Sequence, residues 1–350
     1  MFSISVCMIV KDEELTIERI LSNVSKFADE IIVVDTGSKD RTINLASKYT
    51  NNIFHYEWCD DFSKARNFSF SLASKDYIMW VDADDTITDN NINKILELKN
   101  SKDDVDVYMF KYLLFDKLSP LPLLEYYRER LIKRNLNFKW SGFVHEAITP
   151  TGNIKYLDIE IEHRKIQSGN PKRNLNIYNK ALRNGIKLNP RETYYYAREL
   201  YYNGYYKKSI TKLREFLKSP NIYQANEIEA KILLSDIYKH FKNYTLSKKH
   251  LTDILINHTP TPEVCCKLGE LFFLEDNIVG AIFWFNSATI TPRQQIGFIN
   301  RDHELFIPYL NLSIAYYHLG KLEIARDYHS KASQIHPDHP TIIHNSQFFK

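Results

Sequence analysis

The chain has 350 residues, 44% apolar and 25% charged, and Lys plus Arg exceed Asp plus Glu by only 46 to 43. This size allows two domains, each with a full hydrophobic core. Because the charges nearly balance, the net charge gives no reason to expect binding to nucleic acid or membranes. The four cysteines lack metal-ligand or framework spacing and no apolar run reaches membrane-spanning length. We therefore expect a soluble, cytoplasmic protein with reduced thiols.

Up to about Glu162 the chain alternates strand-like and helix-like segments. The first strand has no basic segment before it and no small-residue cleavage site after it, so a core strand fits better than a signal peptide. In the first helix, Leu15, Ile20, Leu21 and Val24 lie nearly on one face. The predicted strands are 3–10, 30–35, 53–57 and 76–81, and the predicted helices are 13–27, 39–48 and 62–73. Their alternation predicts a parallel, doubly wound sheet that binds ligands at the carboxyl ends of its strands.

From about Pro171 the pattern is helical throughout, with many tyrosines. Four segments repeat a turn, an aromatic or aliphatic residue and then a small residue, and they start at Gly204, Lys242, Asp276 and Gly320. These starts resemble tetratricopeptide repeats with insertions. Two interpretations stay open: a concave surface that holds a peptide, and a helical appendage that braces the first half or forms a homodimer. We expect domains at 1–170 and 191–350, joined by a connecting helix within 171–190.

An acidic segment follows the strand at 76–81 directly. Asp82, Ala83 and Asp84 form a DxD pattern, with Asp85 next to it. In an extended chain the side chains of Asp82 and Asp84 point the same way, and oxygen ligands suit Mg²⁺ or Mn²⁺. A lone DxD is more often an acidic turn that closes a strand. Asp35 at an equivalent strand end makes the functional interpretation stronger, because both positions lie where such sheets bind ligands.

Several motifs stand in one order along the chain: Met8–Glu14, Val33–Asp40, Asp61–Asn67, Asp82–Asp84, Trp140–Glu146 and Glu162–His163. In this order they resemble a family-2 glycosyltransferase of the GT-A fold with C-terminal tetratricopeptide repeats. The subgroup with such repeats includes the peptide S-glycosyltransferases that modify glycocin bacteriocins. The resemblance spans nearly the whole chain, and it implies a Rossmann-like α/β GT-A sheet domain followed by an all-α repeat domain.

The resemblance implies a set of nucleotide-sugar contacts. Asp35 would pair with the base; its structural alternative is a helix N-cap, a role closer in sequence to Ser38 or Asp40. Arginine suits phosphate because its planar guanidinium bonds two oxygens, and the alternative for Arg66 is a surface helix charge. The remaining implied positions are Val10 and Glu13 at the base, Asn67 beside the ribose and diphosphate, Asp82 and Ala83 near the ribose, and Arg130 at the acceptor or diphosphate.

The same resemblance implies a metal site and an acceptor side. Asp84 would bind Mg²⁺ or Mn²⁺, and His163 would complete the site, although a lone histidine is more often structural. His145 or Glu146 would deprotonate the acceptor, and the sequence does not choose between them. Trp140 either stacks on a sugar ring or packs in a turn around Gly142.

These residues predict an inverting glycosyltransferase that uses a nucleotide sugar, with UDP as the expected nucleotide and a peptide or protein as acceptor. An envelope glycan or lipid-linked sugar is the alternative acceptor. A non-catalytic repeat scaffold is disfavoured, because Asp35, Asp84, Glu146 and the other motif residues are intact. A nucleotidyltransferase is disfavoured because a glycine- and arginine-rich phosphate loop near the N-terminus is missing.

Overall fold

The computed structural model describes residues 1–115, 122–164, 166, 170–292 and 300–349. Two compact units make up the chain, Met1–Tyr195 and Tyr196–Lys350, and their boundary falls inside a helix, α6. None of the helices in the described ranges combines the length and apolar character that crossing a membrane requires.

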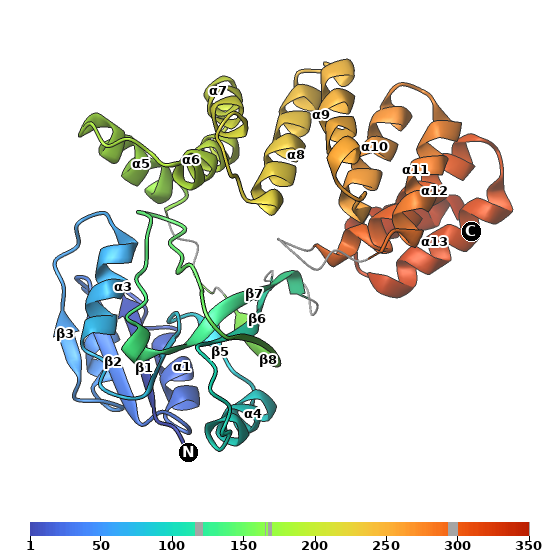
Figure 1. The fold of residues 1–350 in the computed structure, drawn as a ribbon. Coiled ribbons are helices and arrows are strands. Elements are labelled where there is room, and N and C mark those ends of the chain that lie inside the picture. Colours follow the sequence, from blue (N-terminus) through green and yellow to red (C-terminus); the bar gives the residue numbers. More distant parts are fainter. Residues whose placement is uncertain (116–121, 165, 167–169, 293–299, 350) are drawn as a thin grey trace. The chain divides into compact units, whose positions relative to one another are not determined.

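The first unit contains one sheet with helices on both faces, and the second contains helices (Figure 1). The strands are β1 (Ile4–Val10), β2 (Glu30–Asp35), β3 (Ile53–His55), β4 (Tyr77–Trp80), β5 (Asp85–Thr86), β6 (Val107–Phe115), β7 (Pro122–Lys133) and β8 (Ile154–His163). The helices up to the boundary are α1 (Ile17–Val24), α2 (Thr42–Ala46), α3 (Phe62–Ser71), α4 (Asp89–Lys99), α5 (Arg173–Arg183) and α6 (Pro190–Tyr202). The later helices are α7 (Tyr206–Leu217), α8 (Gln224–His240), α9 (Tyr244–Asn257), α10 (Pro262–Leu274), α11 (Ile278–Ile290), α12 (Phe306–His318), α13 (Leu322–Ile335) and α14 (Pro340–Asn345).

The eight-stranded sheet has the order β3-β2-β1-β4-β7-β6-β8-β5. The four strands expected from the sequence, β1 to β4, are present and pair in parallel, which confirms the doubly wound half. The rest makes the sheet mixed, because β7 runs antiparallel to both β4 and β6. The carboxyl ends of β1, β2 and β4 therefore lie at one edge of the sheet, beside each other.

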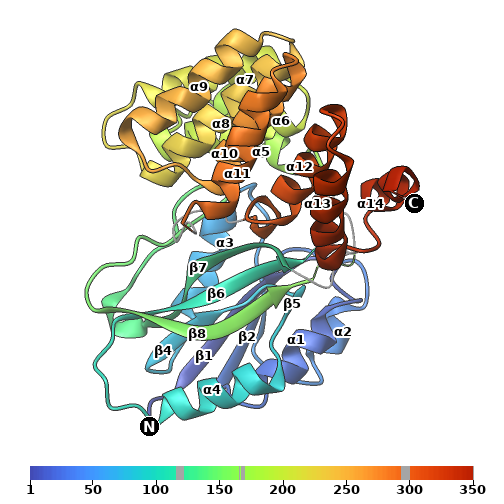
Figure 2. The same ribbon diagram turned by 90° about the vertical axis from the view of Figure 1, so that its right-hand side faces the viewer.

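Alternating side chains of β1 divide the core between the two faces of the sheet. Ile4, Val6 and Met8 pack in the cluster under α1, α2 and α4, which lie on one side (Figure 2). Cys7 packs in the other cluster, under α3. The expectation that Leu15 belongs to the buried face of the first helix is wrong: α1 begins only at Ile17, so Leu15 precedes it and is 56% exposed.

The helical pairs α6–α7, α8–α9, α10–α11 and α12–α13 follow the repeat predicted from the sequence. Each predicted start adopts a left-handed backbone, with φ of +77° at Gly204, +56° at Lys242, +60° at Asp276 and +71° at Gly320. The small residues five positions on, namely Ser209, Ser247, Ala281 and Ala325, are all 0% exposed. A left-handed turn followed by a small buried residue thus brings the two helices of each pair together.

Candidate active site

The predicted site residues gather at the carboxyl ends of the parallel strands. Val10, the last residue of β1, is the register partner of Asp35, the last residue of β2. On the other side of β1, strand β4 leads into Asp82, Ala83 and Asp84. Ala83 is buried, whereas the side chains of Asp82 and Asp84 stay 27% and 17% exposed. Both acidic side chains therefore remain accessible to a ligand.

His163 is far from the acidic segment in the sequence but contacts it in the structure. The short strand β5 pairs with the end of β8, so that Asp85 and His163 are register partners. Nδ1 of His163 lies 3.2 Å from Oδ1 of Asp84 and 3.4 Å from Oδ1 of Asp85. Ligand atoms of Asp82, Asp85 and His163 all lie within 4.8 Å of one another, which makes this a candidate metal group among the described residues. The two residues assigned to the metal from the sequence, Asp84 and His163, are in contact.

The charges of this cluster shift one another's pKa. Burial is the largest single influence and raises the pKa of Asp82, but the charges of Arg66, Arg130 and His163 and the hydrogen bond from Arg66 together hold that pKa below its usual range. Burial alone would lower the pKa of His163, yet its hydrogen bonds to Asp84 and Asp85 raise that pKa to about 10. Without a bound metal, the cluster therefore contains an ionised Asp82 and a protonated His163 imidazole.

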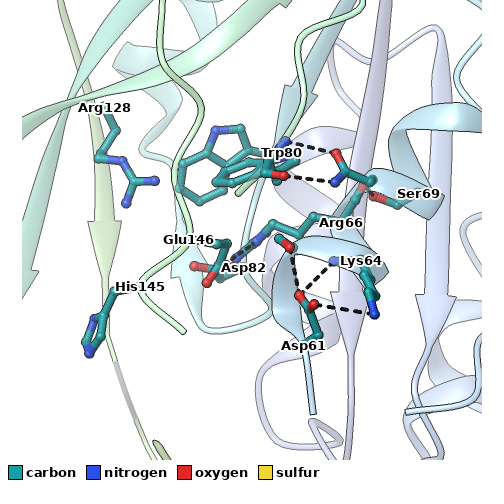
Figure 3. Close-up of polar contacts among 12 residues, drawn as sticks. Asp61, Lys64, Arg66, Ser69, Trp80, Asp82, Arg128, His145 and Glu146 are labelled. Carbon is teal, nitrogen blue, oxygen red and sulfur yellow. Dashed lines mark hydrogen bonds and ion pairs between the residues drawn. The ribbon is translucent and has the colours of Figure 1, made fainter. Parts of the chain in front are cut away.

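Arg66, on α3, joins the acidic cluster to the predicted acceptor motif (Figure 3). Its Nη2 donates to Asp82 Oδ1 at 2.7 Å and its Nε donates to Glu146 Oε1 at 2.6 Å. The guanidinium also lies 4.9 Å from the ring centroids of both Trp80 and Trp140. Because its side chain is only 8% exposed, this cation is fixed between the two carboxylates.

Asn67 and Trp140, both predicted to bind the nucleotide sugar, hold each other in the structure. The Asn67 amide nitrogen donates to the Trp140 carbonyl and its oxygen accepts from the Trp140 backbone N–H, both at 2.9 Å. The Trp140 ring is 3% exposed and packs edge-on against Trp80, with ring centroids 5.1 Å apart. These contacts position the loop that carries the acceptor motif; a direct contact of either residue with substrate stays a prediction.

Asp35 and its neighbours form the predicted base-binding end of the edge. Its two carboxylate oxygens accept from the backbone N–H groups of Gly37 and Ser38, at 3.1 and 3.0 Å. The exposed side chain of His55 lies 3.7 Å away. Asp35 therefore shapes the loop after β2 but does not cap the next helix, because the N-cap residue of α2 is Arg41. Its pairing with a base stays a prediction.

Glu13 lies at the same end and responds to the acidic cluster. Burial raises its pKa, a hydrogen bond from Thr16 lowers it, and the charges of Asp84 and Asp82 raise it further. The influence of Asp84 and Asp82 on its pKa agrees with a position of Glu13 at the same edge of the sheet as the acidic cluster. Just before it, Asp12 has φ of +55°, a left-handed conformation that Asn and Asp tolerate best, so an aspartate fits this position as an asparagine would.

The loop with His145 and Glu146 is held by helices α5 and α6. His145 has φ of +53°, and its ring stacks on Tyr195 with centroids 4.4 Å apart and planes 15° apart. Arg191 donates to the His145 carbonyl at 3.0 Å, and Tyr178 donates to the carbonyl of Val144 at 3.3 Å. The first unit thus extends through the beginning of α6 because these helices support the loop.

Arg130, predicted to touch acceptor or diphosphate, is 0% exposed. Its Nη1 donates to the Trp80 carbonyl at 3.0 Å and to Asp85 Oδ2 at 3.2 Å. Its guanidinium lies 3.5 Å from the Trp80 ring centroid and 4.2 Å from that of Tyr112. The structure thus surrounds Arg130 with protein groups and gives it the geometry of a positioning residue.

Asp85 and Tyr112, for which the sequence predicts no role, lie at the centre of the site. Asp85 is 0% exposed and accepts from the Asp82 backbone N–H at 3.0 Å and from the Tyr112 hydroxyl at 2.8 Å. The Tyr112 oxygen also lies 2.9 Å from Nδ1 of His163. The third carboxylate after β4 was the available signal for Asp85, whereas Tyr112 in an apolar strand carried none.

Several known proteins are similar to parts of this chain. The profile of Glycosyl transferase family 2 matches residues 5–150. A TPR repeat-containing protein of Synechococcus elongatus is 38% identical over 113 residues, which cover 32% of this chain and 27% of that protein. The SPbeta prophage-derived glycosyltransferase SunS of Bacillus subtilis is 27% identical over 280 residues, covering 72% of this chain and 62% of SunS. The crystal structure of S. aureus TarS 1-349 is 14% identical, covers 81% of this chain and 90% of that one, and has a TM-score of 0.38.

Residues 5–150 are thus a family-2 glycosyltransferase domain, built on a GT-A-like sheet. The chain that follows forms tetratricopeptide-like helix pairs, so the chain combines a domain of this family with such repeats. The chain spans less than two thirds of the length of these curated relatives, 27% of the Synechococcus protein and 62% of SunS.

The donor set of the acidic cluster fits a divalent cation. Carboxylate oxygens with one imidazole nitrogen suit Mn²⁺ or Mg²⁺ better than a soft metal. The partly exposed side chains of Asp82, Asp84 and His163 could hold such an ion, whereas Asp85 is buried and already accepts hydrogen bonds from Tyr112 and Arg130. A metal that binds His163 must displace its proton, because a ligating imidazole nitrogen is unprotonated.

Proposed function

We propose that the protein is an inverting glycosyltransferase that moves a sugar from a UDP-sugar to a side chain of a peptide or protein. The observation that carries this proposal is the buried Arg66, which joins Asp82 of the DxD segment to Glu146 of the Trp140–Glu146 loop. Because this cation is fixed between the DxD segment and the Trp140–Glu146 loop, it supports a site in which the sugar donor and its acceptor lie next to each other.

The donor end of the site would use the edge formed by β1, β2 and β4. Asp35 and Glu13 would lie near the base, together with the backbone of Val10, which is the register partner of Asp35. Asp84 and His163 would hold Mg²⁺ or Mn²⁺. A divalent cation bound there would act as a Lewis acid that stabilises the negative charge of the departing diphosphate.

Glu146 is the proposed general base. Its Oε1 accepts from Arg66, while Oε2 has no partner among the described residues. Oε2 would accept the proton of the acceptor hydroxyl or thiol as the acceptor oxygen or sulfur bonds to the anomeric carbon. The bond from that carbon to the diphosphate oxygen breaks with its electrons on UDP, and a single displacement of this kind inverts the anomeric centre. His145 would orient the acceptor from its stack on Tyr195.

A peptide or protein acceptor is supported by the second unit. Stacked helix pairs of this kind commonly present a surface that holds extended peptide. The similarity to SunS covers 72% of the chain and therefore extends beyond the family-2 domain at residues 5–150.

The experiment that tests the proposal measures UDP release from a panel of UDP-sugars with Mn²⁺ or Mg²⁺, with and without candidate peptides. We expect hydrolysis that depends on the metal and transfer that depends on the peptide. In a thermal-shift assay, UDP with Mn²⁺ should raise the melting temperature of the wild type and not that of Asp84→Ala. An equal shift in both proteins, or none in the wild type, would contradict a metal-dependent UDP-sugar site.

A matched variant separates binding from transfer. Glu146→Gln keeps an acceptor for Arg66 and removes the base, so we expect UDP binding to persist while transfer falls about 10²- to 10⁴-fold. Transfer at the wild-type rate would assign the base to another residue.

A further inference from the structure

The ring of Trp80 is surrounded by three arginines that differ in what they can still bind. The guanidinium carbons of Arg66, Arg128 and Arg130 lie 4.9, 4.7 and 3.5 Å from its centroid. The side chains of Arg66 and Arg130 are 8% and 0% exposed, whereas that of Arg128 is 21% exposed. Arg128 is thus the one of these three that presents surface to the solvent.

A β-bulge directs Arg128 and Arg130 to the same ring. Along the β6–β7 ladder, Met109 pairs with Glu129 and Tyr108 pairs with Leu131, which leaves Arg130 as an extra residue on β7. Such a bulge re-aims side chains, and bulges are frequent beside active sites. Figure 3 shows Arg128 directed toward the space that His145 and Glu146 also border.

The ion pairs of the three arginines also differ. Arg66 bonds two carboxylates, Asp82 and Glu146, and cannot turn to a ligand without breaking both bonds. Arg128 pairs with a single carboxylate, its neighbour Glu129, at 3.0 and 3.2 Å. The nucleoside diphosphate that leaves the sugar is a trianion, and it would be held in a site rich in carboxylates. It therefore needs a cation besides the metal. Of these three arginines, Arg128 is the accessible one.

We propose that Arg128 binds the terminal phosphate of the nucleoside diphosphate beside the Trp80 ring. A planar guanidinium bonds two phosphate oxygens, which suits a departing diphosphate. Glu129 competes with the phosphate for the guanidinium. This inference rests on the proposed function, because it requires a nucleoside diphosphate donor.

The test compares the affinities of UDP and UMP, each with Mn²⁺, for the full chain by titration calorimetry. Arg128→Gln should weaken UDP binding about ten- to hundredfold and leave UMP binding unchanged, because UMP lacks the terminal phosphate. Lys133→Gln, at the end of the same strand and paired with Asp104, is the matched control and should change neither affinity. Equal UDP affinity in Arg128→Gln and wild type, or an equal loss for UMP and UDP, would overturn the inference.

Two further variants keep the inference testable if Arg128→Gln does not fold. Arg128→Lys retains a positive charge beside Glu129 and should still lose UDP affinity several-fold, since an ammonium cannot bond two oxygens in one plane. Glu129→Gln removes the competing carboxylate and should tighten UDP binding; weaker binding would show that the pair is only structural. If the wild type binds no nucleoside diphosphate with metal, the proposed function itself fails.

Discussion

Among the described residues both units bury hydroxyls completely, but only the first unit also buries a charged pair completely. In the first unit, the 0% exposed groups include the charged pair of Asp85 and Arg130. In the second unit they include the hydroxyls of Ser209, Ser247 and Ser313. The hydroxyls bond to oxygens within the same repeat, as Ser209 does to the Ala197 carbonyl at 2.8 Å.

This difference distinguishes the second unit, a scaffold of helices, from the first unit, which holds the candidate site. A buried hydroxyl with a local partner costs little, whereas two buried charges lose solvation that their attraction does not always restore. A buried ion pair is therefore weak evidence for stability and fits a role in fixing geometry. In the first unit that geometry is the position of His163 and of the segment after β4.

The largest effect should come from Asp85→Ala. The substitution leaves Arg130 buried without its carboxylate and removes the acceptor of Tyr112, so we expect the first unit to lose about 3–5 kcal/mol of stability. Urea denaturation followed by tryptophan fluorescence measures this loss, since Trp58, Trp80 and Trp140 lie in the first unit. Asp84→Ala, one residue away and partly exposed, is the control and should retain stability. Equal losses in the two variants would argue against a special role for the buried pair.

The second unit should weaken in mild acid through His303. Burial, and after it the charge of Lys267, lowers the pKa of His303 to about 4, below the ordinary value near 6.5. Between these values the unfolded state binds the proton and the folded state does not, so stability falls as pH drops below about 6.5. At pH 5 the loss is ~2 kcal/mol relative to pH 7. His303→Gln should lose less stability than the wild type over this range in urea melts; an identical loss would exclude His303 as the cause.

Overpacking should weaken the second unit by a smaller amount. A Cβ on Gly269 of α10 would lie 2.6 Å from the ring of Phe285, which is fully buried on α11. Gly269→Ala should cost about 1–2 kcal/mol, because the strain exceeds the gain in helix propensity. UDP binding should be unchanged. The double variant with Phe285→Leu should lose less than the sum of the single losses; strict additivity would place the clash elsewhere.

The smallest effects should be equal in the two units. Thr88 caps α4 in the first unit and Thr261 caps α10 in the second, each by accepting a backbone N–H three residues on. Thr88→Ala and Thr261→Ala should each cost about 1 kcal/mol by urea denaturation. A clear difference between them would show that even local rules act differently in the two units.

Much of the fold was predictable because its signals are local. The strands at the start of the chain and the left-handed turns at Gly204 and Gly320 follow from apolar runs and turn residues that lie next to each other. The mixed character of the sheet was not predictable in this way. The direction of β7 depends on its pairing with β4, some fifty residues earlier in the chain.

The site was predictable only as far as its motifs. Residue types at strand ends indicated Asp35, Asp82 and Asp84, and the structure places all three at one edge. The contacts made across the unit were not visible in the sequence, above all the bond from Tyr112 to Asp85 across 27 residues. Arg128 was missed for the same reason, because its relation to Trp80 depends on a bulge.

The support that α5 and α6 give to His145 has a consequence for how such proteins can be recombined. A fragment that ends at residue 170 would keep every carboxylate of the acidic cluster and lose the Tyr195 ring, the Arg191 bond and the Tyr178 bond. An exchange of one repeat array for another would therefore preserve the loop only if the crossover fell after Tyr195. The segment that must be transferred as one piece includes the first turns of α6, a helix that belongs, by its sequence pattern, to the repeats.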